Sequence, residues 1–263
     1  SPSTYPTVLA WQSPPLTNLL GYATIGDTDA DGHMEIIHSI NTLGISRLVI
    51  FENKGDNNFE QVFYRLLSPQ GDGRKLVADL DADGHLEIAF CGTYGYLHVF
   101  ESPADNVWQE TFFDSTGLLN AYAVTGGLDT DGNGKPELFV AGDTPEAPRE
   151  RHTLVYEDVG NERFARVATL VFDDQHIGGL TNKVADLDGV GRPEYVLQVF
   201  PQLLVYRSVA PGQWTIVTRL MDPNPAGTHN GLAAFDVNRN GRTELFWMST
   251  GGGTTLVLEH APV

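Results

Sequence analysis

The residues best suited to chemistry in this chain are carboxylates that recur at fixed spacing. The stretch from Asp27 to Glu35 reads D-T-D-A-D-G-H-M-E, with acids at positions 1, 3, 5 and 9 and a glycine at position 6. Oxygens at alternate positions of a tight loop can converge on one point, and a glycine permits the sharp turn. Carboxylates this close together repel one another unless a cation lies between them. Ca²⁺ prefers a cage of oxygen ligands, so the stretch predicts a calcium-binding loop.

The same pattern occurs four more times along the chain. All five motifs keep aspartate at position 1, glycine at position 6 and glutamate at position 9. Their starts lie 52, 50, 57 and 50 residues apart, at Asp27, Asp79, Asp129, Asp186 and Asp236. Solvated acidic turns would not explain a glycine at position 6 in every motif. The spacing indicates a structural repeat that covers nearly the whole chain.

The segments around each motif predict the strands that position it. Each of the first four motifs is followed by an apolar run that ends in an aromatic residue, and a second aromatic comes eight residues later. These pairs are Phe51/Phe59, Phe100/Trp108, Tyr156/Phe164 and Tyr206/Trp214. The connectors between them are rich in turn residues, so each pair predicts a β-hairpin. One repeat then contains a strand before the motif, a strand after it, and a hairpin.

Four-stranded units that repeat at this interval are typical of the blades of a β-propeller. We therefore predict an all-β chain, with residues 1–263 forming one five-bladed propeller of four antiparallel strands per blade. The chain ends after the third strand of repeat five and begins with T-Y-P-T-V-L-A-W-Q-S, which resembles a fourth strand. We expect this N-terminal strand to complete the last blade and close the ring, which removes open sheet edges. The alternative is a fragment of a larger ring.

The motif differs from an EF-hand, which needs an acid at position 12 and flanking helices. Position 12 here is occupied by His38, Phe90, Val140, Leu197 and Trp247, and the flanks are predicted strands. The pattern D-x-[DN]-x-[DN]-G-x-x-E before an aliphatic strand, once per blade, resembles the FG-GAP/VCBS-type repeats of integrin-α-like β-propellers. The resemblance extends over all five motifs. Most Phe-Gly and Gly-Ala-Pro signatures are missing, so the chain is closer to the bacterial VCBS-like branch.

The resemblance implies one Ca²⁺ per blade, three to five ions in all, held by side chains at positions 1, 3, 5 and 9 and by the carbonyl at position 7. The first three sites would then be Asp27, Asp29, Asp31, His33 and Glu35; Asp79, Asp81, Asp83, His85 and Glu87; and Asp129, Asp131, Asn133, Lys135 and Glu137. The last two would be Asp186, Asp188, Arg192 and Glu194; and Asp236, Asn238, Asn240, Arg242 and Glu244.

The five predicted sites differ in strength. Val190 stands at position 5 of the fourth motif and offers no side-chain oxygen, and the fifth motif has asparagines at positions 3 and 5. We expect the first two sites to bind most tightly, then the third, the fifth and the fourth. His33 and His85 suggest zinc as an alternative, but at position 7 the carbonyl is the ligand and the side chain is expected to point away.

Composition excludes several classes of function. A net charge of -18 argues against nucleic acid or an anionic membrane as partner. No apolar run is long enough to span a bilayer, so membrane insertion is not expected. The single Cys91 is expected to be a small buried hydrophobe, because one cysteine cannot form an internal disulfide.

Calcium sites of moderate affinity suit an extracellular protein, so we expect a secreted or cell-surface monomer that serves as a binding, adhesion or scaffold module. The face opposite the calcium loops would carry a protein or glycan ligand. Its loops contain Asn41, Thr93–Tyr96, Asn120, Arg149–His152, His176, Asn182 and His229–Asn230. The alternative is a carbohydrate-active enzyme, a glycosidase or polysaccharide lyase, which needs paired acids across a central pocket. The predicted inner strands hold no such acids before the motifs, so we do not expect an enzyme.

Overall fold

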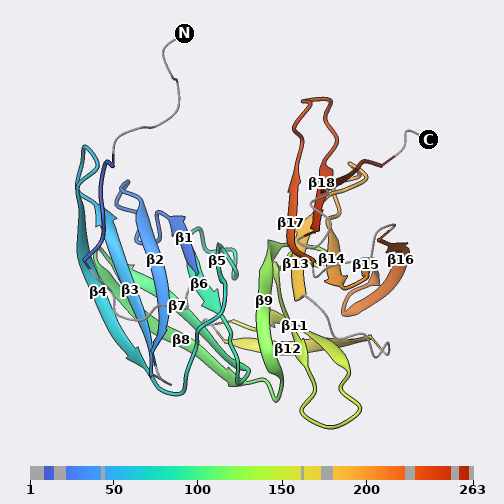
Figure 1. The fold of residues 1–263 in the computed structure, drawn as a ribbon, viewed down its shortest axis with the longest axis horizontal. Helices are drawn as coiled ribbons and strands as arrows, with labels where there is room; N and C mark the ends of the chain where they lie inside the picture. Colours follow the sequence, from blue (N-terminus) through green and yellow to red (C-terminus); the bar gives the residue numbers. More distant parts are fainter. Residues whose placement is uncertain are drawn as a thin grey trace.

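Five antiparallel β-sheets build the computed structural model, which describes residues 9–14, 22–42, 45–160, 163–172, 180–222, 229–249 and 255–260. The sheets follow one another in chain order around an arc (Figure 1). All regular structure in the described residues is β-strand. The all-β class is confirmed, and the five successive sheets are consistent with the predicted blades. No described segment forms a helix that could cross a membrane.

Strands are joined in sequence order within each sheet. The first sheet contains β1 (Ala23–Gly26), β2 (Glu35–Thr42), β3 (Ile45–Asn53) and β4 (Phe59–Leu67). The second contains β5 (Lys75–Ala78), β6 (Glu87–Phe90), β7 (Tyr96–Ala104) and β8 (Val107–Ser115). The third contains β9 (Leu119–Leu128), β10 (Glu137–Asp143), β11 (Arg151–Asp158) and β12 (Phe164–Phe172). The fourth contains β13 (Leu180–Ala185), β14 (Glu194–Val199), β15 (Gln202–Ala210) and β16 (Gln213–Met221). The fifth contains β17 (His229–Phe235), β18 (Glu244–Ser249) and β19 (Thr255–Leu258).

The core lies between successive sheets, because alternate residues of a strand point to opposite faces. On β3, the buried side chains of Leu48 and Ile50 join a cluster with Ile88 and Phe90 of the second sheet. The alternate residues Val49 and Phe51 point to the other face. The two-residue period of apolar residues thus buries both faces of β3, one of them against the second sheet.

The innermost strands connect the sheets into an arc. β1 contacts β5, β5 contacts β9, β9 contacts β13, and β13 contacts β17. Within the described residues, no comparable contact joins β17 back to β1. Figure 1 shows the first and fifth sheets at the two ends of the arc.

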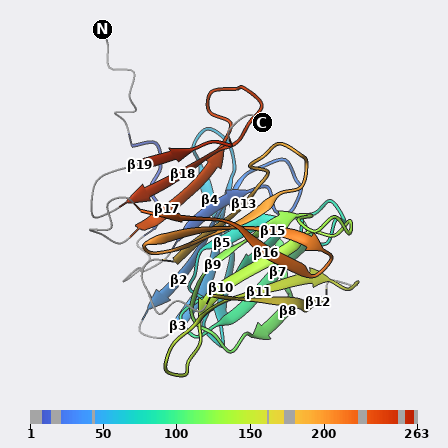
Figure 2. The same ribbon diagram turned by 90° about the vertical axis from the view of Figure 1, so that its right-hand side faces the viewer.

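The predicted closing strand falls partly outside the described residues. Residues 9–14 are described and form no strand. Trp11 packs instead on the first sheet, with ring centroids 5.4 Å from Phe51 and 5.0 Å from Phe59. The fifth sheet has three strands in the described part of the chain, and β19 lies at its edge (Figure 2).

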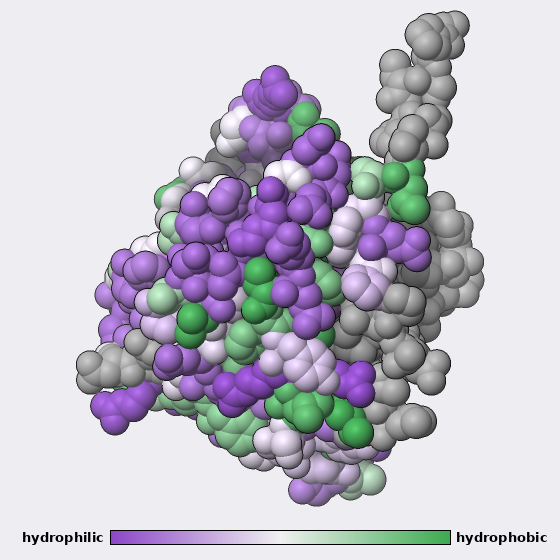
Figure 3. Space-filling model, turned by 90° about the vertical axis from the view of Figure 1, so that its left-hand side faces the viewer, coloured by the Kyte–Doolittle hydropathy of each residue, from purple (hydrophilic) through white to green (hydrophobic). Residues whose placement is uncertain are grey.

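The outward side of the first sheet is mainly polar. Hydrophilic side chains cover most of the surface seen from that side, and hydrophobic ones form smaller patches between them (Figure 3). Tyr64 and Leu66 of the edge strand β4 are 51% and 57% exposed. The outward side of the first sheet is therefore a polar surface that carries a few exposed apolar side chains.

Candidate metal centres

The five acidic motifs form the turns between the first and second strands of their sheets. In every motif, the N–H of the glycine at position 6 donates a hydrogen bond to the aspartate at position 1, at 2.8 to 3.1 Å. The φ angles of these glycines lie between 80° and 96°, a region that favours glycine over any other residue. The invariant pair of aspartate and glycine therefore has a conformational cause, independent of any ion.

The glutamate at position 9 fixes the loop from the other side. In all five motifs its Oε2 accepts a hydrogen bond from the backbone N–H at position 2, at 2.5 to 2.9 Å. Each glutamate is the first residue of its second strand and is at most 3% exposed. Five motifs thus share one hydrogen-bonded frame, with a buried carboxylate at its inner end.

The other carboxylate oxygen of this glutamate distinguishes the loops. In Glu35, Glu87 and Glu137, Oε1 is buried and accepts no hydrogen bond. A buried acceptor without a donor is destabilising, and more so when it carries charge. These three oxygens therefore call for a positively charged partner.

The first loop has the most complete set of ligand atoms. Asp27, Asp29, Asp31 and Glu35 each offer an oxygen, and these atoms lie within 4.8 Å of one another. Oδ1 of Asp27 and Oδ1 of Asp29 are also buried without a hydrogen-bond donor. In the second loop, oxygens of Asp79, Asp81 and Glu87 form a similar group. Converging hard oxygens fit Ca²⁺ in both size and charge.

Electrostatics point to the same conclusion. Burial raises the pKa of Glu35 to about 7 and the pKa of both Glu87 and Glu137 to about 8. Neighbouring aspartates of the same loops raise these pKa values further by repulsion. A bound cation would supply the opposite charge and keep the three carboxylates ionised.

A second glutamate near the loops was missed by the sequence analysis. It lies in the second half of the third strand or directly follows that strand, and four sheets have it: Glu52, Glu101, Glu157 and Glu259. Glu52 lies opposite Glu35 in the β2–β3 register, and Glu157 lies opposite Glu137 in β10–β11. Like charges directly opposite in a sheet repel, so a cation near these pairs is favourable. Nζ of Lys54 already lies 2.5 Å from Oε1 of Glu52, and Nδ2 of Asn133 donates to Oε1 of Glu157 at 3.1 Å. The signal was available, because each glutamate directly follows the apolar run of the third strand.

Two of these glutamates join groups of converging ligand atoms. Oxygens of Glu52, Asp29, Asp31 and Asp105 lie within 4.8 Å of one another, and Asp83, Glu87 and Glu101 form another such group. Asp105 comes from the β7–β8 hairpin of the second sheet. The ligand set of the first loop therefore extends to the neighbouring sheet.

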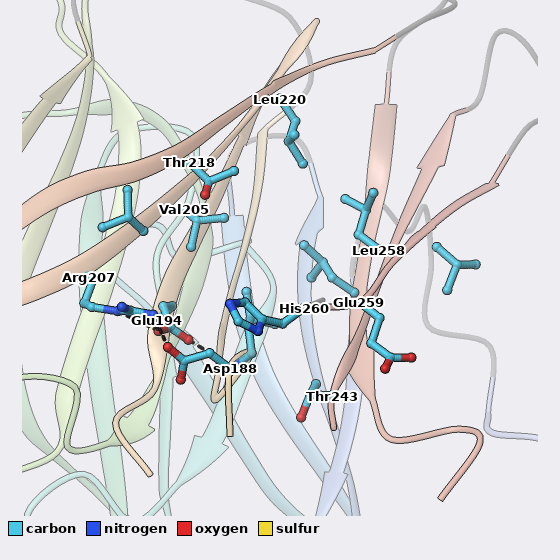
Figure 4. Close-up of a pocket in the computed structure, with 14 residues that line it drawn as sticks. Asp188, Glu194, Val205, Arg207, Thr218, Leu220, Thr243, Leu258, Glu259 and His260 are labelled. Atoms are coloured by element: carbon cyan, nitrogen blue, oxygen red, sulfur yellow. Dashed lines mark hydrogen bonds and ion pairs between the residues drawn. The ribbon is translucent and has the colours of Figure 1, made fainter. Parts of the chain in front are cut away.

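The fourth loop keeps the frame but contains its own cation. Arg207 of β15 donates to Oε1 of Glu194 from Nε at 3.0 Å and from Nη2 at 2.7 Å. Its Nη2 also pairs with Oδ2 of Asp188 (Figure 4). Glu194 and Asp188 raise the pKa of the guanidinium, chiefly through the hydrogen bond to Glu194. The predicted ligands Asp188 and Glu194 are brought together, but around a guanidinium.

The fifth loop satisfies its carboxylates with amides. Nδ2 of Asn238 donates to Oε1 of Glu244, and Nδ2 of Asn240 donates to Oε1 of Glu259 at 3.1 Å. Rotation of either amide would present an oxygen in place of the nitrogen. This loop has the residues for an ion but fewer negative charges than the first three.

One prediction about the histidines was wrong. Nδ1 of His33 lies 2.9 Å from Oδ2 of Asp31 and 3.5 Å from Oε1 of Glu52, so the ring turns toward the loop. The carboxylate of Asp31 raises the pKa of the ring through this hydrogen bond. The side chain therefore lies beside the carboxylates that it was expected to avoid, because their charge attracts it.

The first and third loops also contact the next sheet. The N–H of Asn106 donates to Oδ2 of Asp29 at 2.8 Å, and the N–H of Gly212 donates to Oδ2 of Asp131 at 2.8 Å. Both donors lie in the hairpin between the third and fourth strands of the following sheet. Aspartate at position 3 thus joins neighbouring sheets with one oxygen while the other faces its own loop.

The opposite face places Tyr94 and Tyr96 together. They line a pocket of about 530 Å³ with Ile45, Leu66 and Pro69, between the first and second sheets. Tyr94 is 53% exposed. Two aromatic side chains in one pocket give this face an amphipathic binding surface.

Other predicted ligand-face residues have structural roles. Arg151 forms a buried ion pair with Asp143 at 2.6 Å, and Asn120 donates to the same carboxylate at 3.2 Å. Asn182 is buried and donates to the carbonyl of Ala123 at 3.1 Å. His176 and the side chains of Asn41, His229 and Asn230 lie outside the described residues.

Comparisons with known proteins support the fold. No protein family and no curated protein matches the chain. A lectin from Agrocybe aegerita that recognises non-reducing terminal N-acetylglucosamine is similar in structure, with a TM-score of 0.57 and 18% identity over 92% of this chain and 67% of the lectin. Sqt1 from Chaetomium thermophilum is similar with a TM-score of 0.53 and 17% identity, over 90% of this chain and 66% of Sqt1.

At such low identity these similarities concern the fold alone. They support a β-propeller architecture for the five sheets. The chain spans about two thirds of the length of each of the two proteins.

Proposed function

We propose that this protein is a calcium-stabilised β-propeller of the FG-GAP/VCBS type that serves as an extracellular binding module. The observation that carries the proposal is the buried, unpaired Oε1 of Glu35, Glu87 and Glu137. In each loop it lies at the inner end of a frame shared by all five motifs. Ca²⁺ would bring positive charge to that oxygen and to the aspartates at positions 1 and 3.

Ca²⁺ would act on structure rather than on a reaction. In the first loop it would be held by Asp27, Asp29, Asp31 and Glu35, with Glu52 beside them. Because Asp29 also accepts the Asn106 N–H of the second sheet, an ion there would stiffen the junction between two blades. Binding to the folded state alone would then raise the stability of the whole ring.

The proposal includes a five-bladed ring closed by residues 4–13 as the fourth strand of the last blade. A pocket of about 650 Å³ lies between the fourth and fifth sheets, lined by Leu187, Leu220, Leu245 and Leu258 among others. It borders β19, the edge strand that the closing strand would pair with. Trp11 already covers Phe51 and Phe59 on the first sheet, the face that the last blade would cover in a closed ring.

A glycan is the ligand class that we propose for the opposite face. Tyr94 and Tyr96 offer aromatic faces in an open pocket, and a structurally similar protein is a lectin. We propose binding without catalysis, and a secreted or surface location, where Ca²⁺ is plentiful. A glycan array probed with the wild type and with Tyr94→Ala tests the ligand. Binding that survives unchanged in Tyr94→Ala would exclude this pocket.

The calcium proposal is tested by thermal unfolding with excess Ca²⁺ and with chelator, together with the metal content of the protein. We expect a fall in Tm of at least several degrees under chelator, since a ligand at about 100 times its Kd adds about 2.7 kcal/mol per site. Mg²⁺ at equal concentration is the control, because it requires stricter geometry. An unchanged Tm and no bound metal would refute the proposal.

A further inference from the structure

The residue that directly follows the apolar run of the third strand differs in one sheet only. It is glutamate in four sheets, at Glu52, Glu101, Glu157 and Glu259, and arginine in the fourth sheet, at Arg207. We propose that the guanidinium of Arg207 takes the place of Ca²⁺ in the fourth loop, so that the chain binds at most four ions. The inference rests on the proposed function for the other loops.

Arg207 lies where an ion would have to lie. Its nitrogens contact Oε1 of Glu194 and Oδ2 of Asp188, the carboxylates at positions 9 and 3 of the motif. The corresponding Oε1 atoms of Glu35, Glu87 and Glu137 have no hydrogen-bond donor. The oxygen that is left for a cation in three loops is thus already paired in the fourth.

The rest of the fourth loop agrees with this replacement. Val190 at position 5 provides no ligand and is 71% exposed. The frame nevertheless keeps its hydrogen bonds, from Gly191 N–H to Asp186 and from Leu187 N–H to Glu194, both at 2.9 Å. The fourth loop thus lacks the metal ligand at position 5 but keeps its backbone hydrogen bonds, as expected if Arg207 balances its carboxylates in place of an ion.

Charge balance explains why the arginine excludes the ion. Of the three acids of the fourth loop, Asp188 and Glu194 are paired with the fixed positive charge of Arg207, and Asp186 accepts backbone hydrogen bonds. Ca²⁺ would have to displace the guanidinium from a site where Glu194 is 1% exposed. Fixed donors in a fork geometry satisfy two carboxylates at once, which a monodentate lysine would not do. The fourth blade is therefore independent of calcium.

The experiment is the calcium stoichiometry of three proteins, by native mass spectrometry and by metal analysis after gel filtration. The wild type should hold four ions or fewer. Arg207→Glu combined with Val190→Asp restores the residues found in the first loop and should hold one ion more than the wild type. Arg207→Met, the matched control, removes the excluding charge without adding a ligand, so any extra ion should bind more weakly than in the double variant.

Thermal unfolding of the same proteins provides the second measurement. Arg207→Met should have a lower Tm than the wild type both with Ca²⁺ and with chelator, because Asp188 and Glu194 lose their partner. The double variant should lose Tm under chelator and recover it with Ca²⁺.

Two results would overturn the inference: a fifth ion in the wild type, or an Arg207→Met variant as stable as the wild type in chelator. Absence of any ion from the wild type and the double variant would instead refute the proposed calcium function. In that case the Tm of Arg207→Met still decides whether Arg207 neutralises the loop.

Discussion

The third and fourth loops have the same backbone frame and opposite electrostatics. Both have the glycine N–H at position 6 bonded to the aspartate at position 1, and the N–H at position 2 bonded to the glutamate at position 9. In the third loop, Glu137 lies opposite Glu157 and retains an unpaired oxygen. In the fourth, Glu194 is paired with Arg207.

The difference separates two roles that a motif of this kind combines. Positions 1, 6 and 9 determine the shape of the turn, since they keep their bonds in both loops. The charge at position 5 and at the end of the third strand determines which cation balances the carboxylates. A motif match therefore predicts the loop conformation more reliably than it predicts a bound metal.

The largest expected effect is on the pH dependence of the metal-free protein. The pKa of Glu137 is about 8 in the folded protein and 4.5 in a free chain, because burial disfavours its charged form. Between these values only the unfolded chain releases the proton, so stability is highest near pH 4.5 and falls as pH rises to about 8. At about 1.4 kcal/mol per pKa unit, a shift from 4.5 to about 8 corresponds to at most about 5 kcal/mol for one buried group.

Urea unfolding in chelator from pH 5 to pH 8 measures this loss. Glu137→Gln should reduce the slope, since the amide does not titrate. Glu194→Gln, its counterpart in the fourth loop, should lower stability while leaving the contribution of Glu137 in place. With saturating Ca²⁺ the slope should weaken or reverse, because the ion binds the deprotonated carboxylates. A metal-free protein that gains stability from pH 5 to pH 8 would contradict the burial argument.

A smaller effect should follow from removal of the aspartate at position 1. Asp129 accepts hydrogen bonds from Gly132 at 2.6 Å and from Gly134 at 2.8 Å, and Asp186 accepts equivalent bonds from Gly189 and Gly191 at 2.9 Å. Asp129→Ala and Asp186→Ala should each lower the free energy of unfolding by about 2 kcal/mol in chelator, since backbone donors lose their acceptor.

Calcium should then separate the two variants. Asp129→Ala should gain less stability from Ca²⁺ than the wild type does, since one ligand of the third site is lost. Asp186→Ala should gain as much as the wild type. Urea titrations with and without Ca²⁺ measure both gains, and equal gains in the two variants would remove the distinction between the loops.

The repeat made much of the fold predictable from sequence. The spacing of the five motifs and the aromatic pairs predicted the strand order within each sheet, because these features depend on local turn chemistry and on period-two patterning. The glycine at position 6 was predictable for the same reason, since its positive φ is a local requirement.

The contents of the sites were less predictable because they depend on strand register. Arg207 is thirteen residues from Glu194 in sequence, and only the pairing of β14 with β15 brings the two side chains together. The ring of His33 is turned toward the loop by its contact with Asp31, and it also lies 3.5 Å from Oε1 of Glu52, another residue of a third strand. A prediction from the motif alone therefore misses the ligands and cations that the third strand contributes to the loop.

The smallest expected effect concerns how the two loops contact the next sheet. Oγ1 of Thr130, at position 2 of the third loop, accepts a hydrogen bond at 3.2 Å from Nε1 of Trp214 on β16. Position 2 of the fourth loop is Leu187, which lines the apolar pocket beside the fifth sheet. Trp214→Phe retains an aromatic ring but removes the N–H, and should lower the free energy of unfolding by about 1 kcal/mol.

A double-mutant cycle with Thr130→Val isolates the hydrogen bond from the change in packing. The coupling energy between the two positions should be about 1 kcal/mol, and the cycle formed by Trp108→Phe and Thr28→Val should give a similar value. The second cycle is informative because Nε1 of Trp108 donates to Oγ1 of Thr28 at 3.1 Å in the first loop. A coupling near zero in both cycles would mean that the tryptophan joins these loops to the following sheet by packing alone. That is the contact expected of a loop with leucine at position 2.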